Sequence, residues 1–461
     1  MSAILDAAGD PVVSPVVHSA PPLVALASIE PFEQSVTPPL PESIDDLGIG
    51  QAVVEQLILK HLYARGELLG REIAAALGMQ FSLIDEILES QKRQHHVGVR
   101  KSLGMGNSSG IFGLTESGRD LTREHLENNQ YIGPAPVPLY QYSEVVRRQR
   151  LRENWLNPAL LKTAFKHLVV EDDILAKIGP AVNSNKSFLI YGQPGNGKTA
   201  LAEALFRVET EPIYMPYAIE SQGNIVQVFD PIYHQRIADD ESEVSAFSSE
   251  FSYDHRWFKC KRPFIITGGE LALEMLDLTY NKVSKVYDAP FQLKANNGIY
   301  LIDDFGRQKA TPAEILNRWI VPMERHVDYL NFQAGGKMTV PFEAFLIFST
   351  NLSPDRLGDE AFLRRIQYKM FLRSPGEHEF IEIFERFCRS REILCSRELL
   401  HNFVEKFYVQ GGKRFRRCHP RDIITHAIDI IHFESLPMEL TEELLDQAFN
   451  SCFVENVDTN D

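Results

Sequence analysis

"KSFLIYGQPGNGKTALAEALF", Lys186 to Phe206, decides the fold that we expect for this chain. The apolar run from Phe188 to Tyr191 predicts a buried strand, and the stretch rich in Ala and Leu after Thr199 predicts a helix. The loop between them fits the phosphate-binding pattern G-x-x-x-x-G-K-[ST] in full. Its residues are Gly192, Gln193, Pro194, Gly195, Asn196, Gly197, Lys198 and Thr199, and Ala200 follows in the helix.

This loop predicts a site for ATP and Mg²⁺. Its glycines allow backbone N–H groups to face phosphates at the start of a helix. Lys198 would reach the β- and γ-phosphates, and the hydroxyl of Thr199 would bind Mg²⁺. A chance glycine turn is the alternative, but strand, loop and helix occur in the required order.

A second strand ends in two adjacent acids. In "GIYLIDDFGRQ", Gly298 to Gln308, an apolar run stops at Asp303 and Asp304. Ligands gather at the carboxyl ends of parallel strands, so we expect Asp303 to meet the Mg²⁺ held by Thr199. Asp304 would activate water. It is one methylene shorter than the Glu more often found there, and catalysis is sensitive to displacements of about 1 Å.

Four further polar positions follow. The strand "FEAFLIFSTN" ends in Asn351, which could orient the attacking water or simply terminate the strand. Arg364 and Arg365 in "LGDEAFLRRIQYKMF" have the planar fork that suits a transition-state phosphate, and would more naturally reach a neighbouring subunit's site. Arg421 follows Pro420 at a helix start. Taken alone, such arginines are more often surface residues.

Together these segments resemble the AAA+ ATPase family over about residues 155–455. The order is the phosphate loop, "LIDD" (301–304), "FSTN" (348–351), "FLRR" (362–365) and "HPRD" (419–422). The resemblance implies an α/β fold with a parallel sheet core (156–373) and a C-terminal helical lid (374–455), assembled into a ring that we expect to be a hexamer. It also assigns roles: Asp303 to Mg²⁺, Asp304 to water activation, Asn351 to the first sensor, Arg364 or Arg365 to the arginine finger, and Arg421 to the second sensor.

Residues 1–44 are rich in proline and predict a flexible tail. Residues 45–130 resemble a winged helix-turn-helix domain, and 131–155 predict a linker. Its first part, "YIGPAPVPLYQY" (131–142), predicts a stiff, extended segment, and "EVVRRQRLRENW" (144–155) predicts a solvated basic helix, with contact to a neighbouring subunit or DNA as the alternative. The basic run "KRQHHVGVRK" (92–101) favours DNA binding through residues 82–101. Acids on the third helix, including Asp85 and Glu89, oppose it and favour docking of a protein. Both readings stay open.

Three other segments of the nucleotide-binding region carry structural predictions. A β-hairpin is expected to turn at "AGGK" (334–337), similar to hairpins of bacterial enhancer-binding activators and MoxR-type ATPases, although no GAFTGA-like run is present. The region 213–262 predicts extra β structure, as decoration or as a substrate-facing insertion. The stretch "GGELALEMLDLTYN" (268–281) predicts a helix.

Composition excludes several classes of protein. The net charge of −16 disfavours nucleic acid and anionic membranes as partners of the whole surface. The five cysteines show no CxxC spacing, so neither a disulfide framework nor a zinc site is expected, and a reducing cytoplasm fits. No apolar run approaches a membrane span, and the acidic N-terminus does not fit a signal peptide.

The sequence therefore predicts an ATP hydrolase that remodels a macromolecular partner, most naturally a protein client. The alternative is a DNA-binding transcription regulator controlled by ATP. A third hypothesis is a scaffold that binds ATP but turns it over negligibly.

Overall fold

The computed structural model describes residues 36–102, 104, 106–151, 155–208, 210–238, 252–357 and 363–453. Most of the predicted tail, residues 1–35, lies outside these ranges. Residues 36–44, which we expected to belong to that tail, pack against the molecule instead. Pro38 is buried, and its carbonyl oxygen accepts a hydrogen bond from the backbone N–H of Asp254 at 3.3 Å.

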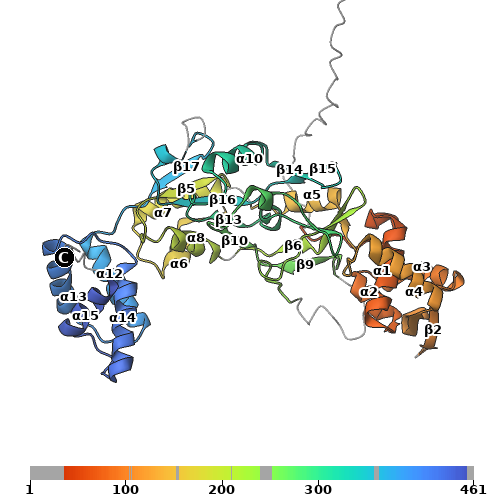
Figure 1. The fold of residues 1–461 in the computed structure, drawn as a ribbon, viewed down its shortest axis with the longest axis horizontal. Helices are drawn as coiled ribbons and strands as arrows, with labels where there is room; N and C mark the ends of the chain where they lie inside the picture. The colour runs from red at the N-terminus through yellow and green to blue at the C-terminus, as the bar shows by residue number, and fades with distance from the viewer. Residues whose placement is uncertain are drawn as a thin grey trace, which may run out of the picture. The chain divides into compact units, whose positions relative to one another are not determined.

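The N-terminal unit has the predicted order of helix, helix–turn–helix, hairpin and helix (Figure 1). Its three-stranded sheet runs in the order β1-β3-β2. The hydrophobic residues of the helices close one core around Phe112, which is fully buried. The elements are α1 (Gln51–Arg65), β1 (Leu68–Leu69), α2 (Gly70–Leu77), α3 (Phe81–Arg93), β2 (Val97–Ser102), β3 (Gly110–Leu114) and α4 (Glu116–Asn128).

The described part of segment 131–155 is packed into the molecule rather than forming a linker, and its helix begins at Leu139, before the basic helix that we expected over 144–155. It contains β4 (Val137–Pro138) and α5 (Leu139–Arg148), and the side chains of Tyr142 and Val146 are fully buried. Tyr142, Val145 and Val146 recur at helical spacing and form one apolar face. The prolines that precede this apolar face favoured the prediction of an extended segment.

A β-rich middle unit is assembled from segments far apart in the sequence. One sheet runs in the order β11-β12-β8-β7-β4, and two antiparallel pairs complete the unit: β6 with β9, which are far apart in the sequence, and the hairpin of β14 and β15. Strands and α5 share one hydrophobic core. Its further strands are β6 (Ile213–Pro216), β7 (Ala218–Ser221), β8 (Asn224–Gln227), β9 (Trp257–Cys260), β11 (Thr279–Asn281), β12 (Val286–Asp288), β14 (Val327–Asn331) and β15 (Lys337–Pro341).

Two predictions for this unit have different outcomes. The hairpin at 334–337 is present as β14 and β15. The helix predicted over 268–281 is wrong, because only the short 3₁₀ turn η3 (Leu273–Leu276) forms there, followed by β11. Pairing of β11 with β12 supplies backbone hydrogen bonds that override the helical spacing of the leucines.

The sheet that carries the glycine-rich loop is parallel throughout, with strand order β10-β13-β16-β5-β17, as the α/β prediction requires. Successive residues of each strand face two different cores: Phe188 and Ile190 face one, and Leu189 faces the other. The strands are β5 (Phe188–Tyr191), β10 (Phe264–Thr267), β13 (Ile299–Ile302), β16 (Phe345–Thr350) and β17 (Tyr368–Phe371).

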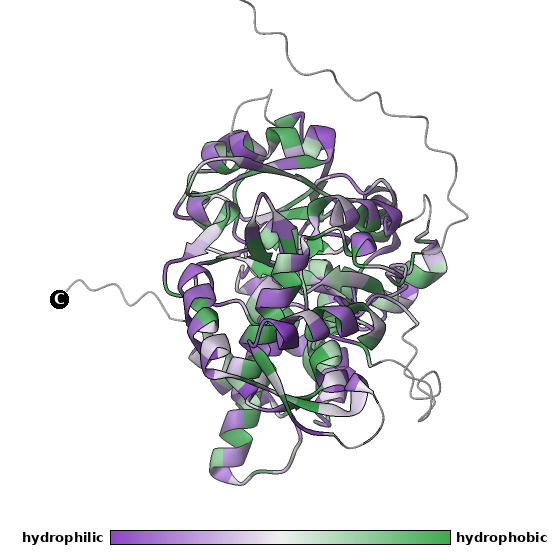
Figure 2. Ribbon diagram, turned by 90° about the vertical axis from the view of Figure 1, so that its right-hand side faces the viewer, coloured by the Kyte–Doolittle hydropathy of each residue, from purple (hydrophilic) through white to green (hydrophobic). Residues whose placement is uncertain are grey.

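Helices cover both faces of this sheet, which a parallel sheet needs because both its faces are apolar. α6, α7 and α8 share the core of one face, and α10 shares the core of the other. Hydrophobic and hydrophilic segments alternate along many helices (Figure 2), as expected where one side of a helix is buried. The helices are α6 (Pro158–Phe165), α7 (Asp172–Asn183), α8 (Lys198–Phe206), α9 (Phe291–Lys294) and α10 (Pro312–Arg325).

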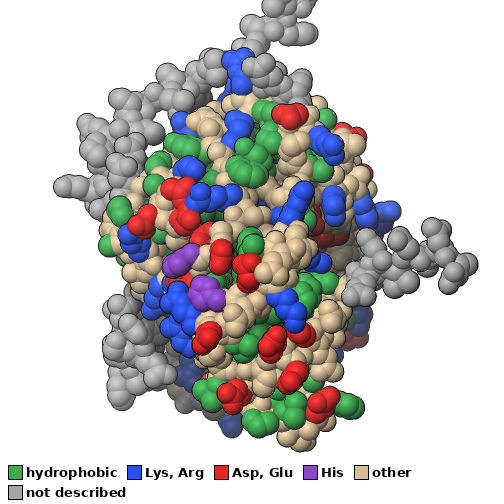
Figure 3. Space-filling view, turned by 90° about the vertical axis from the view of Figure 1, so that its left-hand side faces the viewer, with side chains coloured by type: hydrophobic (Ala, Val, Ile, Leu, Met, Phe, Trp, Pro, Cys, Tyr) green, Lys and Arg blue, Asp and Glu red, His purple; other side chains and the backbone are tan. Residues whose placement is uncertain are grey.

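The four helices predicted for the C-terminal lid are present as α12 (Glu377–Ser390), α13 (Arg397–Val404), α14 (His419–Glu434) and α15 (Glu442–Cys452). They enclose a core rich in Phe, with Phe380 and Phe384 fully buried. Figure 3 shows acidic and basic side chains interspersed on the face that it views. No helix in the described ranges has the length and apolar character that a membrane crossing requires.

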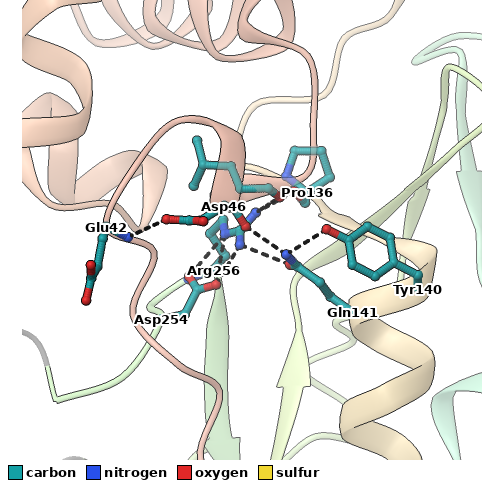
Figure 4. Close-up of polar contacts among 8 residues, drawn as sticks. Glu42, Asp46, Pro136, Tyr140, Gln141, Asp254 and Arg256 are labelled. Carbon is teal, nitrogen blue, oxygen red and sulfur yellow. Dashed lines mark hydrogen bonds and ion pairs between the residues drawn. The ribbon is translucent and has the colours of Figure 1, made fainter.

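One buried arginine, paired with Asp254, joins the middle unit to the N-terminal unit by a hydrogen bond (Figure 4). Arg256 is 1% exposed, and its Nη2 donates to Oδ2 of Asp254 at 2.7 Å. Nη1 donates to the carbonyl oxygen of Leu47 at 2.9 Å, and Nη2 also donates to Oε1 of Gln141 on α5 at 3.2 Å. A single guanidinium therefore binds three separate stretches of chain.

Replacing Arg256 with Met should destabilise the protein by about 3–5 kcal/mol, because the carboxylate of Asp254 would be left buried and unpaired. Urea unfolding measures this loss. The double variant Arg256→Met/Asp254→Leu should recover much of it, since neither charge remains. Arg119→Met, at an exposed position on α4, is the matched control. A loss no larger than the control's would contradict the role of Arg256.

The lid should lose stability in mild acid. Burial lowers the pKa of His419 from 6.5 to about 4, with Lys413 adding to the effect. The folded state therefore holds this histidine neutral, while the unfolded chain takes up a proton as the pH falls below 6.5. Stability should fall between pH 6.5 and pH 4. Thermal unfolding of His419→Gln over that range should show a shallower pH dependence; equal slopes would refute the assignment.

Candidate functional site

The phosphate loop has the conformation that its glycines allow. β5 ends at Tyr191, and α8 begins at Lys198 with Gly197 before it at φ +85°. Gly195 has φ +75°, and a Cβ there would lie 2.6 Å from Sγ of Cys418 in the lid. The loop is therefore closely covered, and its backbone N–H groups at the start of α8 form a site for an anion.

Thr199 and Asp303 come together as predicted. The hydroxyl of Thr199 donates to Oδ2 of Asp303 at 2.8 Å. β13 delivers Asp303 to this edge of the sheet, where its backbone N–H donates to the carbonyl oxygen of Thr267 at 2.8 Å. A hydroxyl and a carboxylate side by side are hard oxygen ligands, and Mg²⁺ in nucleotide sites is bound by one or two such groups with phosphates and water. This pair fits the ion.

Lys198 and Asp304 are joined by the amide of Asn351. Nζ of Lys198 donates to Oδ1 of Asn351 at 2.6 Å, and Nδ2 of Asn351 donates to Oδ1 of Asp304 at 2.5 Å. Nζ also donates to the carbonyl oxygens of Gly192 and Gln193, both at 3.2 Å. Burial lowers the pKa of Lys198, while the carboxylates of Asp303 and Asp304 act in the opposite direction.

Asp304 has a left-handed backbone, with φ +48°. Such a conformation is uncommon outside glycine and tends to occur at functional sites. Neighbouring groups hold it: its N–H donates to Oδ1 of Asp303 at 3.0 Å, and its carbonyl oxygen accepts from the N–H of Arg307 at 3.0 Å. Nε2 of Gln308 donates to the carbonyl oxygen of Asp303 at 2.8 Å.

These side chains line a cavity of about 720 Å³, a volume within the usual range for small-molecule sites. Eleven of the predicted site residues line this cavity: ten belong to the loop and helix start, the acid pair and the first sensor, and one is an arginine of the lid. They are Pro194, Gly195, Asn196, Gly197, Lys198, Thr199, Ala200, Asp303, Asp304, Asn351 and Arg421. Gly192 and Gln193 lie at the start of the loop, where their carbonyl oxygens contact Lys198.

The three predicted arginines differ in placement. Arg421 lines the cavity, but its side chain is 60% exposed and pairs with its neighbour Asp422 at 2.8 Å. Arg364 is exposed, and Nε of Arg365 lies 3.1 Å from Oε1 of Glu324. Neither Arg364 nor Arg365 lines the cavity of its own chain. They remain predicted arginine fingers for a neighbouring subunit.

Two other arginines at the cavity were missed in the sequence. Arg386 on α12 and Arg417 before α14 both line it. Arg417 pairs with Glu379 at 2.9 Å, and both side chains are nearly buried. The run "KRFRRC" ahead of Pro420 was the available signal, but nothing in the sequence tells a buried arginine from its exposed neighbours. Among the described residues, no cluster of three His, Cys, Asp or Glu could hold a metal ion.

Comparison with known proteins finds only distant similarity. A domain family of unknown function (DUF8689) matches residues 376–451, the helices of the lid. No curated protein matches this chain. Solved structures similar to it include three mutants of RuvB from Thermotoga maritima. They are 12%, 11% and 11% identical, cover 61%, 64% and 61% of this chain and 69%, 73% and 69% of their own, with TM-scores of 0.35, 0.37 and 0.35.

Because these TM-scores are low, the fold is assigned from the arrangement of the strands and the site residues alone. The phosphate loop follows a central strand, the acid pair and Asn351 end the next two strands along the sheet, and a helical domain closes the cavity. This chain has an α/β fold with a five-stranded parallel sheet, helices on both faces of the sheet and a C-terminal helical domain.

Proposed function

We propose that this protein binds ATP and hydrolyses it to ADP and phosphate. The observation that carries the proposal is the joining of Lys198, Asn351 and Asp304 by two short hydrogen bonds, beside the Thr199–Asp303 pair. A site that only bound phosphate would need the loop and Lys198. It would have no use for a carboxylate and an amide held in fixed positions across the cavity.

Each residue of the site has its own role in the proposed reaction. Lys198 and the backbone N–H groups of the loop bind the β- and γ-phosphates, and Asn351 orients water beside the γ-phosphate. Asp304 accepts the proton of that water, because its carboxylate lies next to Asn351, whereas the carboxylate of Asp303 is bonded to Thr199. Thr199 and Asp303 would hold Mg²⁺, which when bound neutralises charge on the β- and γ-phosphate oxygens.

Asp304→Asn separates binding from hydrolysis. ATP affinity should stay within about threefold, while turnover should fall by about 10²–10⁴, the usual contribution of a general base. Asn also tolerates a positive φ, so the backbone should keep its conformation. Lys198→Met is the comparison, because it should lose ATP binding itself. Turnover by Asp304→Asn at the parental rate would reject Asp304 as the base and favour the scaffold hypothesis.

We also propose that the protein works as a ring, with a hexamer as the expected form. Arg364 and Arg365 lie away from the cavity of their own chain, so they would complete the site of the next subunit. Both lie between β16 and β17, in a segment that does not contact the nucleotide cavity of its own subunit through these two side chains.

Mixing variants tests this arrangement. Arg364→Ala/Arg365→Ala should hydrolyse ATP weakly alone, and so should Asp304→Asn. When the two are mixed, activity should return, because a subunit with Asp304 can receive arginines from a neighbour that lacks only its own base. The measurement is the steady-state rate of ATP hydrolysis at a series of mixing ratios. Lys406→Ala, on the exposed surface of the lid, is the control variant that leaves both arginines in place. Absence of recovery would rule out supply between subunits.

The hydrolysis would remodel a macromolecular client, for which we propose a protein recruited by the N-terminal unit. Nδ2 of Asn107 donates to Asp85 at 2.7 Å and to Glu89 at 2.6 Å, which ties the loop before β3 to α3. The two acids stay on the helix that a DNA reader would place in the major groove, where phosphate repels them. Steeply salt-dependent DNA binding by the full chain would favour the regulator instead.

A further inference from the structure

The nucleotide cavity has a second wall that the phosphate-binding groups do not use. It is formed by His167 to Val170, in the segment between α6 and α7, together with Ile383 and Phe387 of α12. These side chains are mostly apolar, and Phe387 is aromatic. Phosphates bind at the loop and at Lys198, so this wall is left for the flat, less polar half of a nucleotide.

Arg386 holds the first part of this wall from the lid. Its Nη1 donates to the carbonyl oxygens of Lys166 at 3.0 Å and Leu168 at 2.9 Å. Its Nη2 donates to Oε1 of Glu382, one turn earlier on α12, at 2.6 Å. The glutamate fixes the guanidinium, and the guanidinium fixes two backbone carbonyls of the wall.

Arg417 repeats the arrangement on the other part of the wall. Its Nη1 donates to the carbonyl oxygen of Val169 at 2.7 Å, and its Nη2 donates to Oε1 of Glu379 at 2.9 Å. The side chains of Arg417 and Glu379 are only 11% and 10% exposed. Cδ of Arg417 would lie 3.9 Å from a Cβ on Gly197, so this side chain also passes over the phosphate loop.

The chemistry of the contacts explains why arginine is used twice. A guanidinium offers several N–H donors in a fixed plane, so one side chain can bind a carboxylate and a carbonyl oxygen at once. Hydrogen bonds from a charged donor are about twice as strong as neutral ones. Three such bonds join segment 166–169 to the lid, so the lid cannot swing away without breaking them or carrying the segment along.

We propose that Arg386 and Arg417 are positioning residues that hold segment 166–170 as the binding wall for the base and ribose of the nucleotide. The lid and this wall then close on the nucleotide as one body, and the lid responds to the base as well as to the phosphates. The inference rests on the proposed function, since it takes the cavity to bind ATP.

The test compares ATP with inorganic tripolyphosphate, which has the phosphates but neither base nor ribose. Isothermal titration in the presence of Mg²⁺ gives both affinities for the full chain. Arg417→Lys keeps the charge beside Glu379 but loses the fork, and Arg386→Met removes the two bonds to the carbonyl oxygens of Lys166 and Leu168. Arg417→Lys should weaken ATP binding about tenfold, the loss expected for one charge-assisted hydrogen bond, and Arg386→Met at least as much. Both should leave tripolyphosphate binding within about twofold.

Arg389→Met is the matched control, because Arg389 is an exposed arginine of α12 whose Nε donates only within its own helix, to Glu385. It should change neither affinity. Equal weakening of ATP and tripolyphosphate, or unchanged ATP binding, would overturn the proposal. Failure of the parent protein to bind ATP would instead refute the proposed function. If Arg417→Lys does not fold, as thermal unfolding would show, Arg386→Met decides alone, since the carboxylate of Glu382 is about a third exposed.

Discussion

The position of β16 between β5 and β13 is the constraint on which the site depends. All three strands are parallel, so their carboxyl ends meet at one edge, and Asn351 falls between the phosphate loop and the acid pair. Backbone contacts fix that edge: the N–H of Gly192 donates to the carbonyl oxygen of Thr350 at 3.2 Å, and that of Phe305 donates to Ser349 at 2.7 Å. Any shift of β16 would therefore move Asn351 relative to both Lys198 and Asp304.

The same strand links the site to the rest of the molecule. β15 lies three residues before β16, and its hairpin is part of the core of the middle β-rich unit, with Leu330 and Met338 fully buried. That unit is in turn fastened to the N-terminal unit by Arg256. The hairpin is thus no free arm, because Nε2 of Gln222 donates to the carbonyl oxygen of Lys337 at 2.9 Å and ties its tip to the β7–β8 turn. A continuous path of packed elements leads from Asn351 to the N-terminal unit.

The sequence could predict the features that local chemistry dictates. The phosphate loop, the Thr199–Asp303 pair and the four lid helices follow from glycines, strand ends and helical periodicity, and they are present. It predicted β structure over 213–262 and the hairpin at 334–337, but not that they join one unit, since β4, β8 and β12 pair across long separations in the chain. For the same reason it could not show that α5 packs into the core of that unit. Nor could it show that Arg386 and Arg417 reach carbonyls more than 200 residues away.

The backbone of Asp304 bears on the proposal that an aspartate acts where the family more often has a glutamate. A left-handed residue other than glycine costs about 1–3 kcal/mol, so it persists only where neighbours impose it. Here Asp303, Arg307, Gln308 and Asn351 all bond to the turn or to its carboxylate. The carboxylate that this turn holds accepts a hydrogen bond from Nδ2 of Asn351, so its position is set by the main chain as well as by the side chain. If Asp304 is the base of the proposed reaction, this fixed main chain is what would compensate for the methylene by which Asp is shorter than Glu.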